Sequence, residues 1–423
     1  MNHKLSLLIP LIAASCALFV NRFDQNRLTQ DISSYKASGK KLYCEESSFE
    51  LVNSSKAIQD AFQKFLIQAG SRTPLSHVDK SVLWSLVQMN LRPDQASPTS
   101  KLQIFLKNGQ ETEYYHFYSK QKGAWPYLRG LETLLRDYKS KNTLLKLARH
   151  VDNLFPSQFF VVKNFEAFLE DNKEKIDANS ALKRYYMRAD ETLKENEKIG
   201  KLKLAPLVSH YLRKKKHLNY EHGKTLFSYK GSRGLTARCN YDMRLYSNSI
   251  YLIHKDFIKS HLFGMSSKDG SFLASAAQNL EKFEPVDNSL FFKGDSQTRS
   301  AAFCSFDYSK EELKSLWLVS SESRDPGQHI YHLMEYGLQS ANSATDISDL
   351  IGFSRHLFLE DPTRLVFESN RSSKEQLERL LKLNIPVYNA RQLGNIWAMF
   401  ENKNTKGFVI DERTDGAVSC SKR

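Results

Sequence analysis

The last third of the chain alternates between segments of strand character and segments of helical character. This alternation restricts the fold more than any other feature of the sequence. Strands joined through helices are typical of α/β sheets, so we expect at least one such sheet here. The predicted strands are 316–319, 364–367, 385–388 and 407–410, and the predicted helices are 328–338 and 374–382.

The first half adds longer helices and an antiparallel element. Apolar residues recur at helical spacing within 57–66 and 128–154. The strand-like runs 102–106 and 112–118 flank Asn108-Gly109, a strong hairpin signal. The charged stretch 164–203 has helical propensity and is predicted to be a helical insertion. The predicted class is therefore α/β, and α+β in part.

The amino terminus has the anatomy of an export signal. The apolar run 5–20 follows Lys4, contains Pro10, and is shorter than the roughly 20 residues that span a bilayer. Small residues precede Cys16, which resembles a bacterial lipoprotein signal with Cys16 as the lipidated residue. A plain cleaved signal and an uncleaved anchor are the alternatives. We expect an exported protein of the bacterial cell envelope, with 21–43 as a tether.

Export changes the interpretation of the cysteines. Four of the five cysteines lie beyond Cys16, and in an oxidising compartment they permit two disulfides in any of three pairings. Four free thiols are the alternative. No cluster has metal-ligand spacing; His329 and His332, three residues apart, lack a carboxylate partner, so neither a metal nor another cofactor is predicted. The four cysteines are Cys44, Cys239, Cys304 and Cys420.

The chain is basic. Its 61 Lys and Arg residues against 47 Asp and Glu give a net charge of +14, which favours anionic partners such as phosphate, lipid headgroups or nucleic acid. The 41% of hydrophobic residues excludes a wholly disordered chain. The net charge alone does not indicate which of these anionic partners the protein binds.

Two short motifs favour phosphate. Asn404, Lys406 and Asp411 stand at i, i+2 and i+7, which resembles the HxKxxxxD signature of the phospholipase D superfamily with Asn in place of His. Upstream, His222-Gly-Lys224 supplies the His and Lys of a second copy, with Tyr229 at the Asp position. The resemblance is closest to the cardiolipin-synthase-like members, which contain one motif in each half.

The resemblance implies a domain plan and supporting residues. Two α/β halves, each a mixed sheet flanked by helices, would occupy 44–263 and 299–423, with 264–298 as a linker. The insertion 164–203 would belong to the first half. Asn240 and Arg244, which follow the first motif, also match the family pattern, as do Ser369 and Asn370, which precede the second.

The resemblance also implies a chemistry. In that family one histidine attacks a phosphodiester, a second protonates the leaving alcohol, and the lysines neutralise the phosphoryl oxygens. Here His222 would be the nucleophile, with Lys224 and Lys406 binding the phosphate, while Asn404 leaves the second role vacant because an amide does not exchange a proton near neutral pH. We therefore expect a degenerate phosphodiesterase or phosphatidyltransferase acting on phospholipid. The alternatives are a non-enzymatic envelope lipoprotein that binds anionic ligands and an extracytoplasmic nuclease of the same superfamily.

Overall fold

The computed structural model describes most of the chain after the amino-terminal segment. The predicted signal 1–20, with Cys16, and most of the tether 21–43 lie outside the described residues. None of the helices in the described part is long and apolar enough to cross a bilayer. The structure describes residues 42–421 except 45–48, 53–55, 109–110, 120, 122–123, 215–220, 224–225, 232–234, 245, 247–259, 287–288, 296–300, 309–312, 324, 360–362, 373, 391, 404–405, 415 and 417.

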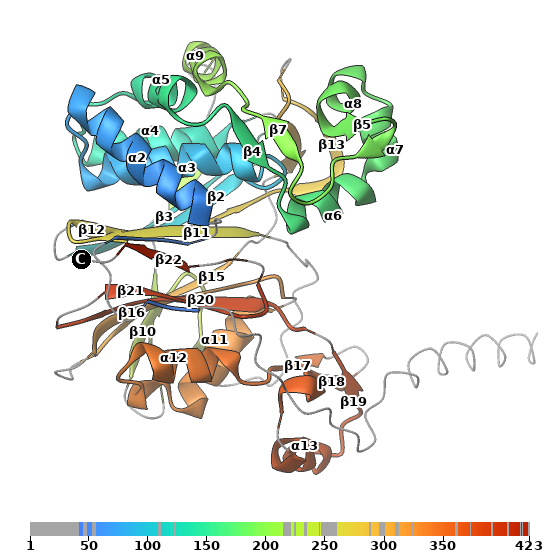
Figure 1. Ribbon diagram of the computed structural model, residues 1–423. Helices are drawn as coiled ribbons and strands as arrows, with labels where there is room; N and C mark the ends of the chain where they lie inside the picture. The colour runs from blue at the N-terminus through green and yellow to red at the C-terminus, as the bar shows by residue number, and fades with distance from the viewer. Residues whose placement is uncertain are drawn as a thin grey trace, which may run out of the picture.

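Two antiparallel sheets stacked face to face form the centre of the molecule (Figure 1). The first sheet has the strand order β22-β1-β11-β12-β2-β3-β8, and the second has the order β21-β20-β16-β15-β10-β9. The strands of the first sheet are β1 (Phe49–Val52), β2 (Lys101–Asn108), β3 (Glu111–Tyr118), β8 (Glu221–Gly223), β11 (His261–Ser267), β12 (Gly270–Ala277) and β22 (Val418–Ser421). Those of the second are β9 (Phe227–Lys230), β10 (Thr236–Cys239), β15 (Ala302–Asp307), β16 (Leu313–Ser321), β20 (Asn395–Asn402) and β21 (Lys406–Ile410).

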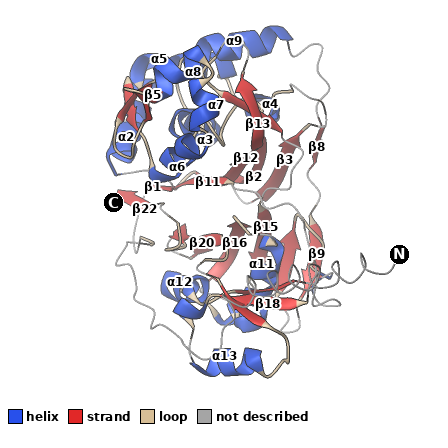
Figure 2. Cartoon of the chain, turned by 90° about the vertical axis from the view of Figure 1, so that its right-hand side faces the viewer, coloured by secondary structure: helices blue, strands red, loops and turns tan. Residues whose placement is uncertain are grey.

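Helices cover the outer face of each sheet, so the molecule has four layers in the order α, β, β, α (Figures 1 and 2). On the first sheet α3 (His77–Leu91) and α4 (Pro126–Asp137) contact the strands, α5 (Leu144–Leu154) packs on α3, and α2 (Lys56–Arg72) and α9 (Leu204–Lys214) pack on α5. On the second sheet they are α11 (Pro326–Tyr336) and α12 (Ala344–Gly352).

Two smaller units extend from this sandwich at its periphery. One lies beside the first sheet and comprises β4 (Gln158–Phe160), α6 (Lys163–Asp171), α7 (Lys173–Asp177), α8 (Ser180–Tyr186), β5 (Met187–Arg188), β6 (Glu191–Thr192), β7 (Lys198–Gly200), β13 (Asn279–Pro285) and β14 (Phe292–Asp295). The other, which we call the small subdomain, comprises β17 (His356–Leu359), β18 (Arg364–Phe367), α13 (Lys374–Leu381) and β19 (Val387–Asn389).

Aromatic side chains fill the space between the two sheets. Phe105 contacts Phe303 and Trp317 across this space, with ring centroids 5.2 and 5.4 Å apart. Small residues let the layers approach closely elsewhere: a Cβ atom on Gly264 of β11 would lie 2.9 Å from the Phe408 ring. Separate apolar clusters hold each sheet to its own helices.

The predicted local elements are largely confirmed. The hairpin around Asn108-Gly109 is β2–β3, in which Leu102 pairs with Phe117. The helical period of 57–66 belongs to α2, and that of 128–154 is divided between α4 and α5. In the last third, α11, α13, β16, β18 and β21 fall where the alternation predicts helices and strands.

The predicted architecture of two halves is wrong. Strands from both ends of the chain share one sheet, because β1 pairs with β22 as well as with β11. The segment 264–298, which the sequence predicts to be a linker, supplies most of β11 and all of β12 in the centre of the first sheet. The pairing is antiparallel throughout both large sheets; a parallel pair, β18 with β19, occurs in the small subdomain.

A disulfide joins two neighbouring strands of the second sheet. Cys239 of β10 and Cys304 of β15 are directly opposite in the antiparallel register and are bonded to each other. Cys44 is also disulfide-bonded. Of the three pairings that the sequence permits, the structure therefore contains the one that joins Cys239 to Cys304.

Candidate functional site

The motif residues of the two predicted halves do not form one site in the described structure. His222 lies in β8 at one edge of the first sheet, four strands from β11. Lys406 lies in β21, which packs against β1 and β11. Four strand spacings amount to roughly 19 Å. Lys224 and Asn404 lie outside the described residues.

Lys406 and Asp411 make structural contacts. The Lys406 Nζ atom donates a hydrogen bond to the Lys268 carbonyl over 3.1 Å. Asp411 is fully buried and accepts hydrogen bonds from the guanidinium groups of Arg355 and Arg413. A carboxylate held by two cations in the protein interior has a role in stability and does not orient a catalytic histidine.

Asp411 belongs to a buried ion network of four residues. Arg413 donates from Nη1 to Asp411 over 3.0 Å and from Nε to Glu368 over 2.9 Å, and Arg355 binds Asp411 from the other side. Burial alone would raise the pKa of Asp411, but the two guanidinium groups outweigh it and lower that pKa to about 2. The network ties the small subdomain, through Glu368, to the segment that follows β21.

The four supporting residues also have structural partners or positions. Asn240 accepts a hydrogen bond from the Phe303 backbone over 2.8 Å and so extends the pairing beside β15. Arg244 is exposed and paired with Asp242, and Ser369 donates to Asn389 over 2.8 Å. Asn370 follows Ser369 in a short 3₁₀ turn. None of these four residues lines the cavity described next.

A polar cavity of about 190 Å³ lies at the end of the sandwich where β11 and β20 begin and β16 ends. We call it the polar cavity. Both sheets contribute to it, together with the segments that follow α3 and β21. Its lining residues are Arg92, Lys163, Asn164, Ser260, His261, Leu262, Glu322, Gln392, Asn395, Trp397, Arg413, Thr414 and Gly416.

Ser260 contributes a serine side chain to the lining of this cavity. It directly precedes β11, a central strand of the first sheet, and is 5% exposed. Its Oγ atom is buried and has no hydrogen-bond partner among the described residues. A buried hydroxyl without a hydrogen-bond partner lowers the free energy of unfolding by about 1–3 kcal/mol. A hydroxyl that is kept beside a cavity in spite of this loss is typical of a group that acts on a ligand.

Trp397 offers an unused donor in the same cavity. It lies in β20, is 2% exposed, and its Nε1–H also has no partner in the described structure. Ser260 and Trp397 thus come from different sheets, and both line one cavity. A nucleophile and a hydrogen-bond donor are the two groups that an attack on a carbonyl requires.

The charged residues around the cavity are mostly paired. Arg92 donates to both Asp94 oxygens, over 2.8 and 2.6 Å, and Arg413 belongs to the buried ion network. The Glu322 carboxylate accepts a hydrogen bond from Asn395 Nδ2 over 3.0 Å. The cavity therefore combines fixed cations and one fixed carboxylate with two unpartnered polar groups.

No histidine base serves Ser260 in the described structure. The adjacent His261 directs its Nε2 atom to the Gln88 side chain of α3, 2.8 Å away. Burial and the neighbouring Arg92 hold the pKa of His261 well below its usual range. The His261 imidazole therefore links β11 to α3 and is not placed to accept a proton from Ser260.

A second serine has a histidine partner but lies in another cavity. The Ser323 Oγ atom is 2.7 Å from Nε2 of His329, on α11. The Nδ1 atom of His329 has no partner among the described residues, so no carboxylate orients the ring. Burial lowers the pKa of His329 well below its usual range. Ser323 is thus a rival to Ser260, with a base but without the third group of a triad.

Sequence reasoning missed Ser260 because no motif marks it and because polar residues and glycines dominate 264–298, which follows it. One signal was available: Asp269-Gly270 between two strand-length runs indicates a hairpin, and β11 and β12 are paired there. The many Ser, Ala and Gly residues of these strands favoured a linker. Small residues are needed there because β12 is covered on both faces, and every residue of this strand is buried.

Comparison of the sequence with protein-family models and with curated proteins finds no match. Solved structures do match. The structure of LmbA2991T421A aligns with a TM-score of 0.66 at 9% identity, covering 91% of this chain and all of that one. The cephalosporin acylase from Bacillus halodurans aligns with a TM-score of 0.62 at 8% identity, covering 94% of this chain and all of that one. Such identities establish a shared fold.

The four-layer sandwich of this chain is therefore the fold of these two solved structures. The resemblance to the phospholipase D superfamily is therefore wrong, and the predicted phosphodiester chemistry and the nuclease alternative are overturned with it. The two short motifs matched by spacing alone.

Proposed function

We propose that the protein is an amide hydrolase in which Ser260 is the nucleophile, exposed as a new amino terminus by cleavage of the Lys259–Ser260 bond. The observation that carries this proposal is Ser260, which lines the polar cavity just before β11 and whose buried hydroxyl has no hydrogen-bond partner in the described part of the chain. The fold supports the reaction class, because one of the similar structures is an acylase.

The proposed amino terminus supplies the missing base. No histidine serves Ser260 as a base among the residues that the structure describes, and Glu322 in the cavity is held by Asn395. An α-amine on Ser260 itself would lie within reach of Oγ and would have a pKa of about 7.7–8.0, so it is largely able to accept a proton at mildly alkaline pH. Amino-terminal amines are established activators of hydroxyl nucleophiles.

The reaction follows from these groups. The Ser260 Oγ atom attacks the amide carbonyl carbon while its proton moves to the α-amine, and the Trp397 Nε1–H donates to the developing oxyanion. The C–N bond then breaks as the leaving amine takes that proton, leaving an ester on Ser260. Water, deprotonated by the α-amine, hydrolyses the ester and releases a carboxylic acid.

The same hydroxyl can produce the amino terminus. Attack of Ser260 Oγ on the Lys259 carbonyl would move the acyl group from nitrogen to oxygen, and water would hydrolyse the resulting ester. The products are a carboxylate on Lys259 and a free amine on Ser260, so atoms balance without a cofactor. This step needs only the hydroxyl that the fold already places at the start of β11.

We further propose that the protein works outside the cytoplasm. The export-type segment 1–20 and the Cys239–Cys304 disulfide support this location, because disulfides persist in oxidising compartments. Phospholipid is no longer the expected partner, since that expectation depended on the phosphodiesterase chemistry.

A covalent probe distinguishes the two candidate serines. We expect a fluorophosphonate, which phosphonylates activated serine hydroxyls, to label the wild-type protein at Ser260, as located by peptide mass spectrometry. Ser323→Ala is the matched control, because Ser323 is buried and already hydrogen-bonded to His329. Undiminished labelling of Ser323→Ala at Ser260 supports the proposal. Labelling of Ser323 in the wild type would assign the nucleophile to the other cavity.

A further inference from the structure

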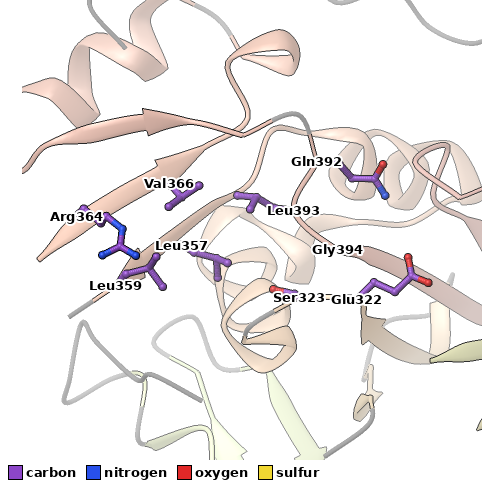
Figure 3. Close-up of a pocket in the computed structure, with 9 residues that line it drawn as sticks. All are labelled: Glu322, Ser323, Leu357, Leu359, Arg364, Val366, Gln392, Leu393 and Gly394. Atoms are coloured by element: carbon purple, nitrogen blue, oxygen red, sulfur yellow. The ribbon is translucent and has the colours of Figure 1, made fainter. Parts of the chain in front are cut away.

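Figure 3 shows the residues that line a second cavity, which has a volume of about 260 Å³. This cavity and the polar cavity share Glu322 and Gln392 in their linings, so they meet at these residues. We call the second cavity the apolar recess. Its remaining lining residues are Ser323, Leu357, Leu359, Arg364, Val366, Leu393 and Gly394.

The small subdomain provides the apolar wall of the recess. Leu357 pairs with Val366, and Leu359 pairs with Arg364, across β17 and β18. Because alternate residues of a strand point to opposite faces, these four side chains share one face of the subdomain sheet. Figure 3 shows them gathered at the end of the recess away from Glu322 and Gln392.

The opposite face of the same two strands forms the core of the small subdomain. Leu365 and Phe367 pack there with Leu377 of α13, and Phe358 is packed against this cluster. The subdomain therefore has a core of its own on one face. Its other face lines the recess with Leu357, Leu359 and Val366, and Leu357 and Leu359 are only 2% and 6% exposed, so the recess is apolar and sheltered from solvent on this side.

The boundary between the two cavities is held in a strained conformation. Glu322 has φ 57°, a left-handed conformation that is uncommon for a residue with a side chain. Gly394 has φ 63° on the adjacent segment, and a Cβ atom there would lie 2.6 Å from the Ser321 carbonyl oxygen. Asn395 links the two segments through hydrogen bonds to Ser321 and Glu322. Strain of this kind persists where a site must keep its shape.

We propose that the apolar recess binds the acyl group of the amide substrate, as a straight aliphatic chain or a single ring. This proposal rests on the proposed function, because the acyl carbonyl must reach Ser260 in the polar cavity. The size is suitable: a dry cavity of about 150 Å³ lined by apolar side chains accepts benzene, so the recess accommodates a somewhat larger group.

The reaction favours the acyl side over the amine side as the occupant. In the proposed reaction the acyl group occupies the site in both steps, because it is transferred to Ser260 in the first and released by water in the second. The amine departs after the first step. A recess that holds the acyl group can stabilise both transition states, and binding energy from a part of the substrate remote from the reacting bond is what raises kcat. A recess for the amine would act in the first step alone.

The test uses the full-length protein and a series of p-nitroanilides with straight acyl chains from acetyl to dodecanoyl. We expect kcat/KM to rise by about fourfold for each added methylene until the recess is full. Val366→Phe fills the recess and is expected to lower the octanoyl-to-acetyl ratio of kcat/KM by about tenfold or more. Leu359→Ala enlarges it and is expected to move the preferred chain length upward.

Leu383→Phe is the control for Val366→Phe. Leu383 is 48% exposed and lines neither cavity, so added bulk there should leave the octanoyl-to-acetyl ratio unchanged. Hydrolysis of the series without dependence on chain length, or equal ratios in Val366→Phe and wild type, would overturn the recess assignment and leave the proposed function standing. Hydrolysis of no member would overturn both.

Discussion

Replacement of Ser260 by Ala is expected to abolish amide hydrolysis and to leave the 259–260 bond intact. Both outcomes have one cause: the variant lacks the hydroxyl that attacks the substrate carbonyl and the Lys259 carbonyl. Loss of the nucleophile in a serine hydrolase lowers kcat by at least about 10⁴-fold. The measurements are hydrolysis of an acyl p-nitroanilide and the intact mass of the purified chain.

Ser275 provides a matched control for Ser260. It is fully buried, its Oγ atom also has no partner in the described residues, and it lies in β12 opposite Leu262. It does not line the polar cavity. Ser275→Ala should therefore remain cleaved and active, while Ser260→Thr should retain part of both reactions. An active, cleaved Ser260→Ala protein would show that another residue is the nucleophile.

The second large effect concerns the buried ion network. Asp411→Ala is expected to lower the free energy of unfolding by about 3–5 kcal/mol, because Arg355 and Arg413 would lose a shared carboxylate in the protein interior. The midpoint of urea unfolding measures this loss. Asp307→Ala removes an exposed ion pair with Arg238 and should cost no more than about 1 kcal/mol.

The pH dependence of the free energy of unfolding provides a second test of the buried ion network. The pKa of Asp411 is lowered from 3.8 to about 2 in the folded state, so its ionised form stabilises the protein above the unfolded-state value. That contribution is lost as pH falls from about 4 toward 2. Asp411→Ala should be less sensitive to acid in this range. An Asp411→Ala protein as stable as wild type at neutral pH would contradict the structural role.

Local elements could be predicted from the sequence because their signals are local. The Asn108-Gly109 turn and the apolar period of α2 depend on neighbouring residues alone. The sheet order could not be predicted in this way, since β1 and β22 pair across almost the whole described chain. The small residues of β11 and β12 concealed their strand character in the sequence. Their burial between helices and a second sheet depends on tertiary structure.

The candidate site was beyond sequence reasoning for a similar reason. Ser260 carries no motif, and its character depends on Trp397, Glu322 and Asn395, which lie in segments distant in sequence. His222-Gly-Lys224 and Asn404-x-Lys406 had the spacing of a known motif without its tertiary setting. Spacing within one segment predicts a site only where the rest of the site is also local.

The central claim is that Ser260 becomes an amino terminus. The most direct measurement is amino-terminal sequencing, together with intact mass, of the wild-type protein purified after export. The account predicts two polypeptides that remain associated, the second of which begins Ser-His-Leu-Phe, matching 260–263. A single chain unbroken between Lys259 and Ser260 in a preparation that hydrolyses amides would contradict it.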